Sequence, residues 1–289
     1  MDAAGSRERL DLCGAWQLAF DPAQQGVRAG WPQGRWPEEA CSQVQVPALW
    51  NVTHPEAEGV GFYRKVFVLP AHWRGRVVRL HFGGASYRAE AWLNGAYVGS
   101  HEGAYTPFCF DVTQQVRPGA ENQLVVRVAA LSRATDVDGM PLAQCPASKQ
   151  SWYYTCGGLW GEVFLESLPL VFCDSIAIEP DLERESVQIE VTVGNAEVQA
   201  RTIELHLTVS RPDGALAAEE RSRLAVPPGA PVLSYRLGLP RPMRWDCENP
   251  NLYRVGVALA DGAEQVDSHT ASFGMRDFSV RDGQFFLNG

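Results

Sequence analysis

The chain has 289 residues, of which 45% are hydrophobic and 20% charged, and its formal net charge at pH 7 is -9. This length predicts about two domains, each large enough to bury a core of its own. The acidic balance without a basic run argues against a nucleic-acid partner, and no apolar run approaches the roughly 20 residues that a membrane-spanning helix requires.

The cysteines indicate a cellular compartment. There are seven of them at irregular spacing, with no C-x-x-C pair. The N-terminus also lacks the apolar core of a signal peptide. Scattered thiols without a leader predict reduced cysteines in a cytoplasmic protein, with no metal site and no cofactor.

The dominant hydrophobic period is two, which predicts strands with one buried face. Apolar and polar residues alternate at residues 78–82, 187–193, 203–209 and 253–259. The 27 glycines and 19 prolines interrupt these segments at short intervals. The best helical candidate, residues 216–224, is short and polar. The chain is therefore predicted to be all-β, with two consecutive β-sandwiches.

We expect the first sandwich to span residues 1–172 and the second, of immunoglobulin-like size, to span 173–273. The first contains a loop at 132–154 that is long for a compact domain, and loops of this length are usually functional or disordered. The last segment, 274–289, finishes on a strand and an Asn288-Gly289 turn. Such a turn predicts a returning strand.

An ordered series of short motifs runs through the first domain. Each motif alone is weak, because a strand–Asn–Gly–strand hairpin occurs in many proteins. In chain order they are L-C-G-A-W (12–16), V-P-A-L-W (46–50), G-F-Y-R-K (61–65), L-H-F-G-G (80–84), A-W-L-N-G-A-Y-V-G (91–99), Y-T-P-F-C-F-D-V-T (105–113), N-Q-L-V-V (122–126) and G-G-L-W-G-E-V-F-L-E (157–166).

This series resembles the sugar-binding jelly-roll domain at the N-terminus of family 2 glycoside hydrolases, which include β-galactosidases, β-glucuronidases and β-mannosidases. Trp245 and residues 249–253 resemble the W…P-x-L-Y signature of the family's immunoglobulin-like domain. Residues 273–276 and 286–289 resemble the start of its catalytic TIM barrel. The resemblance covers essentially the whole chain and implies a jelly roll followed by an immunoglobulin-like sandwich.

The resemblance also implies where the chemistry lies. Family members carry out retaining hydrolysis with two glutamates in the barrel, one of which follows an asparagine. The sequence contains no Asn-Glu dipeptide. We therefore expect no catalytic residue in this chain and no glycoside hydrolysis by it alone. Its role would be to brace its own C-terminal barrel, shape one wall of the sugar pocket and support homo-oligomer contacts.

The loop before Gly158 is the candidate for contact with carbohydrate. In the β-galactosidase and β-glucuronidase branches the matching loop offers an aspartate to the sugar, but Trp152 stands at that place here. Lys149 and Gln150 could donate hydrogen bonds, while Trp152 and Tyr154 could stack on a sugar ring. The alternative is that these aromatic side chains pack the loop onto the sandwich or the barrel. Without the aspartate, the sugar stays unassigned.

Three smaller signals favour ordinary structural roles. Residues 136–139 resemble part of a calcium loop but lack the later acidic ligands, so a solvated turn is expected. His54 and His101 lie in polar segments and are expected to be surface or hydrogen-bonded side chains.

Two other functional hypotheses remain beside the glycosidase fragment. One is a stand-alone carbohydrate-binding β-sandwich protein, which requires an exposed aromatic platform. The other is a structural or adhesive pair of sandwiches without a sugar ligand.

Overall fold

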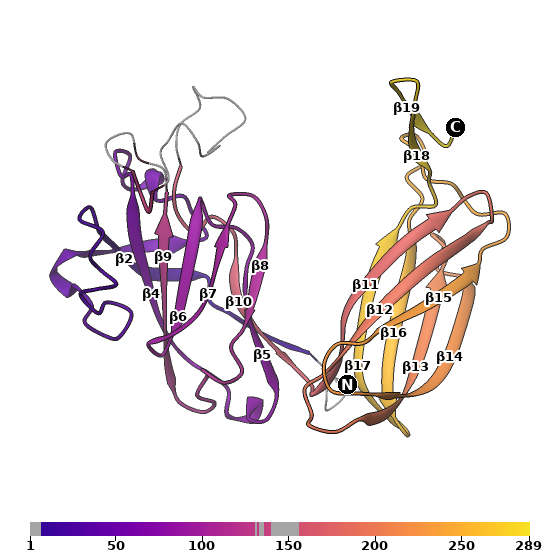
Figure 1. Ribbon diagram of the computed structural model, residues 1–289, viewed down its shortest axis with the longest axis horizontal. Coiled ribbons are helices and arrows are strands. Elements are labelled where there is room, and N and C mark those ends of the chain that lie inside the picture. Colours follow the sequence, from indigo (N-terminus) through magenta and orange to yellow (C-terminus); the bar gives the residue numbers. More distant parts are fainter. Residues whose placement is uncertain (1–6, 131, 133–135, 140–155) are drawn as a thin grey trace. The chain divides into compact units, whose positions relative to one another are not determined.

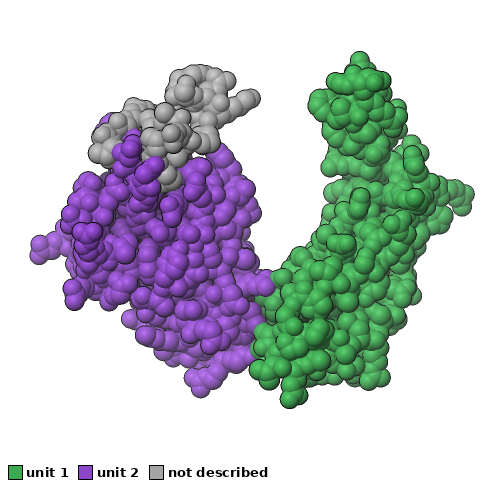
Figure 2. Space-filling view, in the orientation of Figure 1, with its two compact units in different colours: residues 1–7, 168–289 green, residues 8–167 purple. Residues whose placement is uncertain are grey.

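The computed structural model describes residues 7–130, 132, 136–139 and 156–289. These fall into two compact units, residues 8–167 and residues 1–7 with 168–289 (Figure 2). Antiparallel strands make up most of the described residues, which confirms the all-β prediction. No helix within the described ranges is long and apolar enough to cross a membrane. The short 3-10 helices are η1 (Glu38–Ala40), η2 (Trp50–Val52) and η3 (Ala71–Trp73).

The first unit, residues 8–167, contains two sheets with a hydrophobic core (Figure 1). The six-stranded sheet has the order β3 (Cys41–Val46), β2 (Gly14–Phe20), β4 (Val60–Val68), β9 (Glu121–Ala129), β6 (Arg88–Leu93) and β7 (Ala96–Glu102). The four-stranded sheet has the order β1 (Glu8–Asp11), β10 (Val163–Leu168), β5 (Val77–Phe82) and β8 (Phe108–Asp111).

The Asn94-Gly95 pair forms the predicted hairpin between β6 and β7. Both residues have positive φ, 53° and 85°, which a tight turn of this kind needs. The Asn94 side chain also reaches the next strand of the sheet. Its Nδ2 donates to the Gln115 carbonyl at 2.7 Å, and its Oδ1 accepts from the Gln123 amide at 3.0 Å. The turn therefore fixes β6 against β9 as well as against β7.

A second apolar cluster lies on β2, β4, β6 and β9, apart from the main core. It contains Phe62, Trp92 and Trp36, with Trp31 packed against it. Trp31 and Phe62 make an edge contact with ring centroids 5.1 Å apart. Trp31 and Trp36 both belong to the segment between β2 and β3, so this connection covers part of the six-stranded sheet.

The second unit is a sandwich of two further antiparallel sheets around its own core. The three-stranded sheet has the order β11 (Val171–Asp181), β12 (Ser186–Asn195) and β15 (Val232–Gly238). The four-stranded sheet has the order β14 (Leu216–Val226), β13 (Arg201–Ser210), β16 (Tyr253–Asp261) and β17 (Glu264–Phe273). A separate hairpin follows, formed by β18 (Phe278–Arg281) and β19 (Gln284–Leu287).

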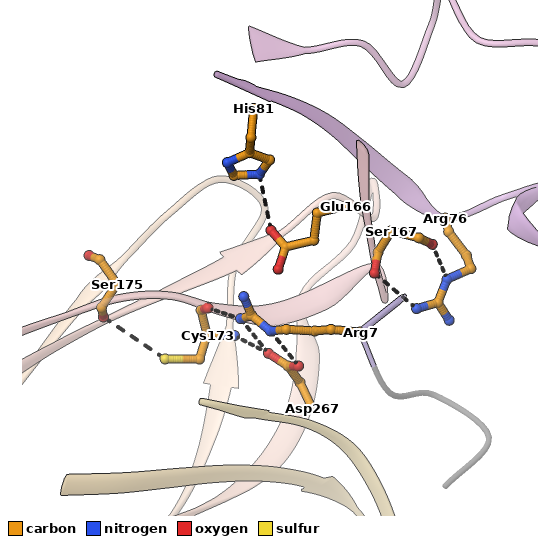
Figure 3. A network of polar contacts seen from close by, with 8 residues as sticks. All are labelled: Arg7, Arg76, His81, Glu166, Ser167, Cys173, Ser175 and Asp267. Atoms are coloured by element: carbon orange, nitrogen blue, oxygen red, sulfur yellow. Dashed lines mark hydrogen bonds and ion pairs between the residues drawn. The ribbon is translucent and has the colours of Figure 1, made fainter. Parts of the chain in front are cut away.

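The chain passes between the units at residues 7/8 and 167/168. The first strand of the second unit, β11, begins at Val171 and pairs with β12. Arg7 belongs to the second unit because its side chain binds residues of that unit. Its guanidinium binds both carboxylate oxygens of Asp267, at 3.1 and 3.0 Å, and the Cys173 carbonyl (Figure 3).

Asp267 lies at the centre of this contact in the second unit. Its side chain is fully buried and also accepts the Cys173 amide at 2.7 Å. Burial and the charge of Asp267 raise the pKa of the Cys173 thiol to about 12, so the sulfur stays protonated. In the first unit, Arg76 Nε donates to the Ser167 hydroxyl at 2.6 Å (Figure 3). His81 Nε2 lies 3.2 Å from Glu166 Oε2.

We expect Asp267→Ala to lower the free energy of unfolding of the second unit by about 3 kcal/mol, because it leaves Arg7 and the Cys173 amide without their acceptor. The measurement is hydrogen exchange in urea on peptides from β11 and β17. Asp261→Ala is the matched control, since the Asp261–Arg201 pair is solvent-exposed and its loss should leave the exchange rates almost unchanged. Equal losses in both variants would contradict the role given to Asp267.

Candidate functional site

The four predicted carbohydrate-contact residues, Lys149, Gln150, Trp152 and Tyr154, lie outside the described residues. What the structure does describe is the chain on either side of residues 140–155. Both of these flanking stretches are fastened to the first sandwich, by contacts of different kinds.

The upstream stretch is fastened by a buried arginine. Arg127 of β9 has a side chain only 7% exposed, and its guanidinium makes two hydrogen bonds to the carboxylate of Asp138, each 2.7 Å long. It also donates to Glu90 of β6 at 2.6 Å. Burial alone would lower the pKa of Arg127, but the bonds and charges of Asp138 and Glu90 raise the pKa above its ordinary value. Arg127 therefore stays charged in a buried site.

Strand register explains why these groups meet. Glu90 and Arg127 are directly paired across β6 and β9, so their side chains share a face of the sheet. Next to Asp138, Val137 is 1% exposed and belongs to the second apolar cluster. The Gln24 amide adds a bond to the Asp136 carbonyl at 3.0 Å.

Residues 136–139 form a turn in which Asp136, Asp138 and Gly139 are exposed, in line with the prediction of a solvated turn. Within it, Val137 is buried and Asp138 binds the Arg127 guanidinium. The same pairing occupies the carboxylate that the calcium-like pattern would have used. Over the described parts of the chain, no group of three or more His, Cys, Asp or Glu side chains could hold a metal ion.

The downstream stretch is fastened by backbone contacts around two glycines. Gly157 accepts from the Trp50 amide at 2.9 Å and donates to Asn51 Oδ1 at 3.0 Å. Gly158 exchanges two backbone bonds with Ser86, of 2.9 and 3.1 Å. The Ser86 hydroxyl donates to the Cys156 carbonyl at 2.8 Å.

These glycines are required by space as well as by conformation. A Cβ at Gly157 would lie 2.2 Å from Cζ2 of Trp50. Gly158 has φ of +120°, and a Cβ there would lie 2.7 Å from the Tyr63 hydroxyl. No side chain fits at either position, so the backbone passes directly over the Trp50 and Tyr63 side chains.

A shallow cavity of about 450 Å³ lies beside the helix η2. Its lining includes Phe20, His54, Glu56 and Glu58. The His54 ring lies edge-on to Phe20, with ring centroids 5.2 Å apart, and its Nδ1 is 2.9 Å from the Thr53 hydroxyl. His54 is thus the hydrogen-bonded histidine that the sequence favoured. Apolar side chains, Pro22, Pro55 and Ala57, make up the rest of the lining.

His101 is hydrogen-bonded as well. Its Nε2 is 2.9 Å from the Thr106 hydroxyl, and its ring stacks on Phe108 at a centroid distance of 4.2 Å. Each histidine thus lies beside a hydroxyl group, and His54 Nε2 is also 3.4 Å from the Ser42 hydroxyl.

The residues that fasten these stretches were not predicted from the sequence, although one signal indicated a buried partner for Arg127. Arg127 interrupts the apolar run of a central strand, and a charge at such a position requires a buried partner. Nothing in the pattern showed that Glu90 and Asp138 were the partners. Asn51 and Ser86 carried no signal, because their roles depend on backbone groups distant in sequence.

Two protein-family models match the chain. The model described as "Glycosyl hydrolases family 2, sugar binding domain" matches residues 9–169. The model described as "Glycosyl hydrolases family 2" matches residues 171–276. The two matches correspond closely to the two sandwiches.

Individual relatives are longer than this chain. A β-glucuronidase of Bacteroides fragilis is 29% identical over 271 residues, which cover 86% of this chain and 36% of the relative. A β-galactosidase of Priestia megaterium is 24% identical over 311 residues, which cover 96% of this chain and 29% of the relative. The chain thus spans about a third of the length of these curated relatives.

Solved structures share the fold. The β-glucuronidase of Bacteroides uniformis superposes with a TM-score of 0.82 at 24% identity, over 98% of this chain and 34% of that one. The β-glucuronidase of Ruminococcus gnavus gives a TM-score of 0.75 at 23% identity, over 100% of this chain and 48% of that one. The prediction of a jelly roll followed by an immunoglobulin-like sandwich is confirmed by these matches.

We expect Asp138→Ala to lower the free energy of unfolding of the first sandwich by about 2 kcal/mol, because a buried guanidinium loses two charged hydrogen bonds. Hydrogen exchange at residues 136–139 should speed up at the same time. Asp136→Ala is the control, since only the backbone carbonyl of Asp136 is used, and it should change stability by no more than about 0.5 kcal/mol. A silent Asp138→Ala would show that the arginine is satisfied without the loop.

Proposed function

The chain belongs to glycosyl hydrolase family 2, and from that premise we propose that it is the non-catalytic N-terminal portion of a retaining β-glycosidase. In the longer enzyme the two sandwiches would support a catalytic barrel. The segment carrying Lys149, Gln150, Trp152 and Tyr154 would line one side of the sugar pocket. The substrate would be a β-linked glycoside, as the names of the relatives suggest for those proteins.

The observation that carries the proposal is an uncovered apolar face on the hairpin β18–β19. Strand pairing places Phe278 opposite Leu287 and Val280 opposite Phe285, so all four side chains lie on one face. Phe278, Val280 and Phe285 are 64%, 61% and 75% exposed. The rings of Phe278 and Phe285 stack with centroids 5.7 Å apart.

The base of this hairpin is well held. Asn288 and Asp277 exchange two hydrogen bonds, of 2.8 and 3.0 Å, and Asn288 Nδ2 donates to the Trp245 carbonyl at 3.0 Å. The guanidinium of Arg276 lies 4.6 Å from the centre of the Trp245 ring. The hairpin is therefore positioned by the second sandwich, while its apolar face touches little.

Such a face needs a partner. An isolated two-stranded hairpin is at best marginally stable in water, and a contiguous exposed apolar patch marks an interaction site. Because about two thirds of the length of these relatives lies outside the matched part, a further domain of the same chain is the occupant we propose. Residues 274–289 would then be the leading segment of the catalytic barrel.

The proposal is tested by activity. We expect the 289-residue chain to release no nitrophenol from 4-nitrophenyl β-D-glucuronide, β-D-galactoside or β-D-mannoside. A longer gene product that continues from Gly289 should hydrolyse at least one of them with retention of the anomeric configuration. Turnover by the 289-residue chain, or an inactive longer product that is properly folded, would refute the proposal.

The hairpin gives a second test. In the 289-residue chain Phe285→Ser should change stability by no more than about 0.5 kcal/mol, because the ring is exposed. In the longer enzyme the same substitution should cost about 3 kcal/mol, because the ring would then be buried. Thermal unfolding of both proteins measures the difference. Val198→Ser, at a residue 92% exposed in the same unit, is the control and should be silent in both. A silent Phe285→Ser in the longer enzyme would contradict the role of the hairpin.

A further inference from the structure

Two aromatic side chains of the first sandwich are exposed side by side. Tyr105 is 68% exposed and Trp160 is 36% exposed, and their ring centroids are 6.0 Å apart with the planes tilted by 59°. Other large aromatic side chains of this unit, such as Trp16, Trp50 and Trp73, are almost completely buried. Tyr105 and Trp160 lie outside the buried core of the unit, and we call them the Tyr105–Trp160 pair.

Trp160 is held rigidly in place. Its Nε1 donates to the Ala104 carbonyl at 2.8 Å, so the polar atom of the indole is already satisfied. The ring packs against Gly84, where a Cβ would lie 2.7 Å from Cζ2 and 2.8 Å from Cε2. The Gly161 amide donates to the Gly84 carbonyl at 3.0 Å and fixes the two segments against each other. The exposed part of the indole is thus presented in one orientation.

The segment that carries Tyr105 is also fastened. On one side of it, the Gly103 amide donates to the Tyr87 carbonyl at 3.0 Å. On the other side, the Thr106 hydroxyl is 2.9 Å from Nε2 of His101, whose ring stacks on Phe108. A ligand that stacks on the two rings would therefore need to order little of the protein, which favours binding.

The surroundings indicate the chemistry of the ligand. Among the exposed neighbours in the chain, Glu102, Thr106 and Glu162 are polar and Pro107 is apolar, so the apolar area is small. That area is far below the roughly 800 Å² per partner of a stable protein interface. Among the described residues of this surface, the charge of Glu162 is paired with Arg9 at 2.7 Å, so the Arg9 guanidinium is already engaged and is not offered to a phosphate. A flat, uncharged ligand with hydroxyl groups at its rim fits this surface better than a protein or a nucleic acid.

We propose that the Tyr105–Trp160 pair is a stacking platform for a neutral pyranose ring of a β-linked glycan. The C–H face of the sugar would lie on the aromatic rings, and its hydroxyl groups would reach the polar neighbours. The choice of a saccharide as the ligand rests on the proposed function. The position of the platform rests only on the exposed rings and the contacts that hold them.

The test is a saturation-transfer NMR titration of the 289-residue chain with three probes: cellopentaose, β-1,4-mannopentaose and β-1,4-galactopentaose. We expect at least one probe to bind with a Kd in about the millimolar range. Tyr105→Ala should weaken that binding about fivefold to tenfold, and it should leave the fold intact because the side chain is mostly exposed.

Tyr97→Ala is the matched control. Tyr97 is a tyrosine of the same unit, 52% exposed, that packs edge-on against Trp92 and not against Trp160. Its removal should leave the Kd unchanged. The proposal is overturned if no probe binds to the natural chain, if Tyr105→Ala binds as tightly as the natural chain, or if Tyr97→Ala weakens binding equally.

The outcome separates this proposal from the proposed function. If the longer enzyme hydrolyses a β-glycoside while the 289-residue chain binds no probe, the platform is refuted and the proposed function stands. If the chain binds a probe through Tyr105 while the longer protein is inactive, the platform stands and the proposed function is refuted. A marked fall in thermal stability of the longer enzyme on Tyr105→Ala, with probe binding unchanged, would identify the pair as an internal protein contact and overturn the platform.

Discussion

The first sandwich depends on how closely its backbone approaches the indole of Trp50. Added Cβ atoms at Gly61 and Gly157 would lie 2.7 and 2.2 Å from that ring, so only glycine fits at either place. Phe20 makes an edge contact with the same indole, and Tyr63 is stacked parallel to it with centroids 6.5 Å apart. Because one buried ring organises β4, η2 and the segment before β10, residues 156–158 have a fixed position.

Much of the fold could be predicted because its strands follow from the local alternation of apolar and polar residues. The alternation at residues 187–193 became β12, where Val187, Ile189, Val191 and Val193 are completely buried. The best helical candidate, residues 216–224, instead belongs to the strand β14. Its short polar sequence has no helical stripe, and pairing with β13 satisfies its backbone. Where the local signal was weak, tertiary pairing decided the structure.

The contacts that fasten the candidate site could not be predicted in the same way, because they join residues far apart in the sequence. The Arg7–Asp267 ion pair spans 260 residues, and the bond from Gly157 to Asn51 spans 106. A buried charge at Arg127 or Asp267 requires a partner of opposite charge, but the sequence does not show which residue supplies it. The predicted contact residues, from Lys149 to Tyr154, were chosen by resemblance, so their role stays a proposal.

The pairing of β1 with β10 has a consequence for modularity. Glu8 and Ser167 are register partners, so the chain enters and leaves the first sandwich at neighbouring points of one sheet. A domain whose two ends lie side by side can be excised, rejoined by a short linker or opened elsewhere without disturbing its core. The first sandwich is therefore well suited to act as a transferable cassette: a module that could be gained, lost or exchanged between larger proteins at the cost of two adjacent chain connections.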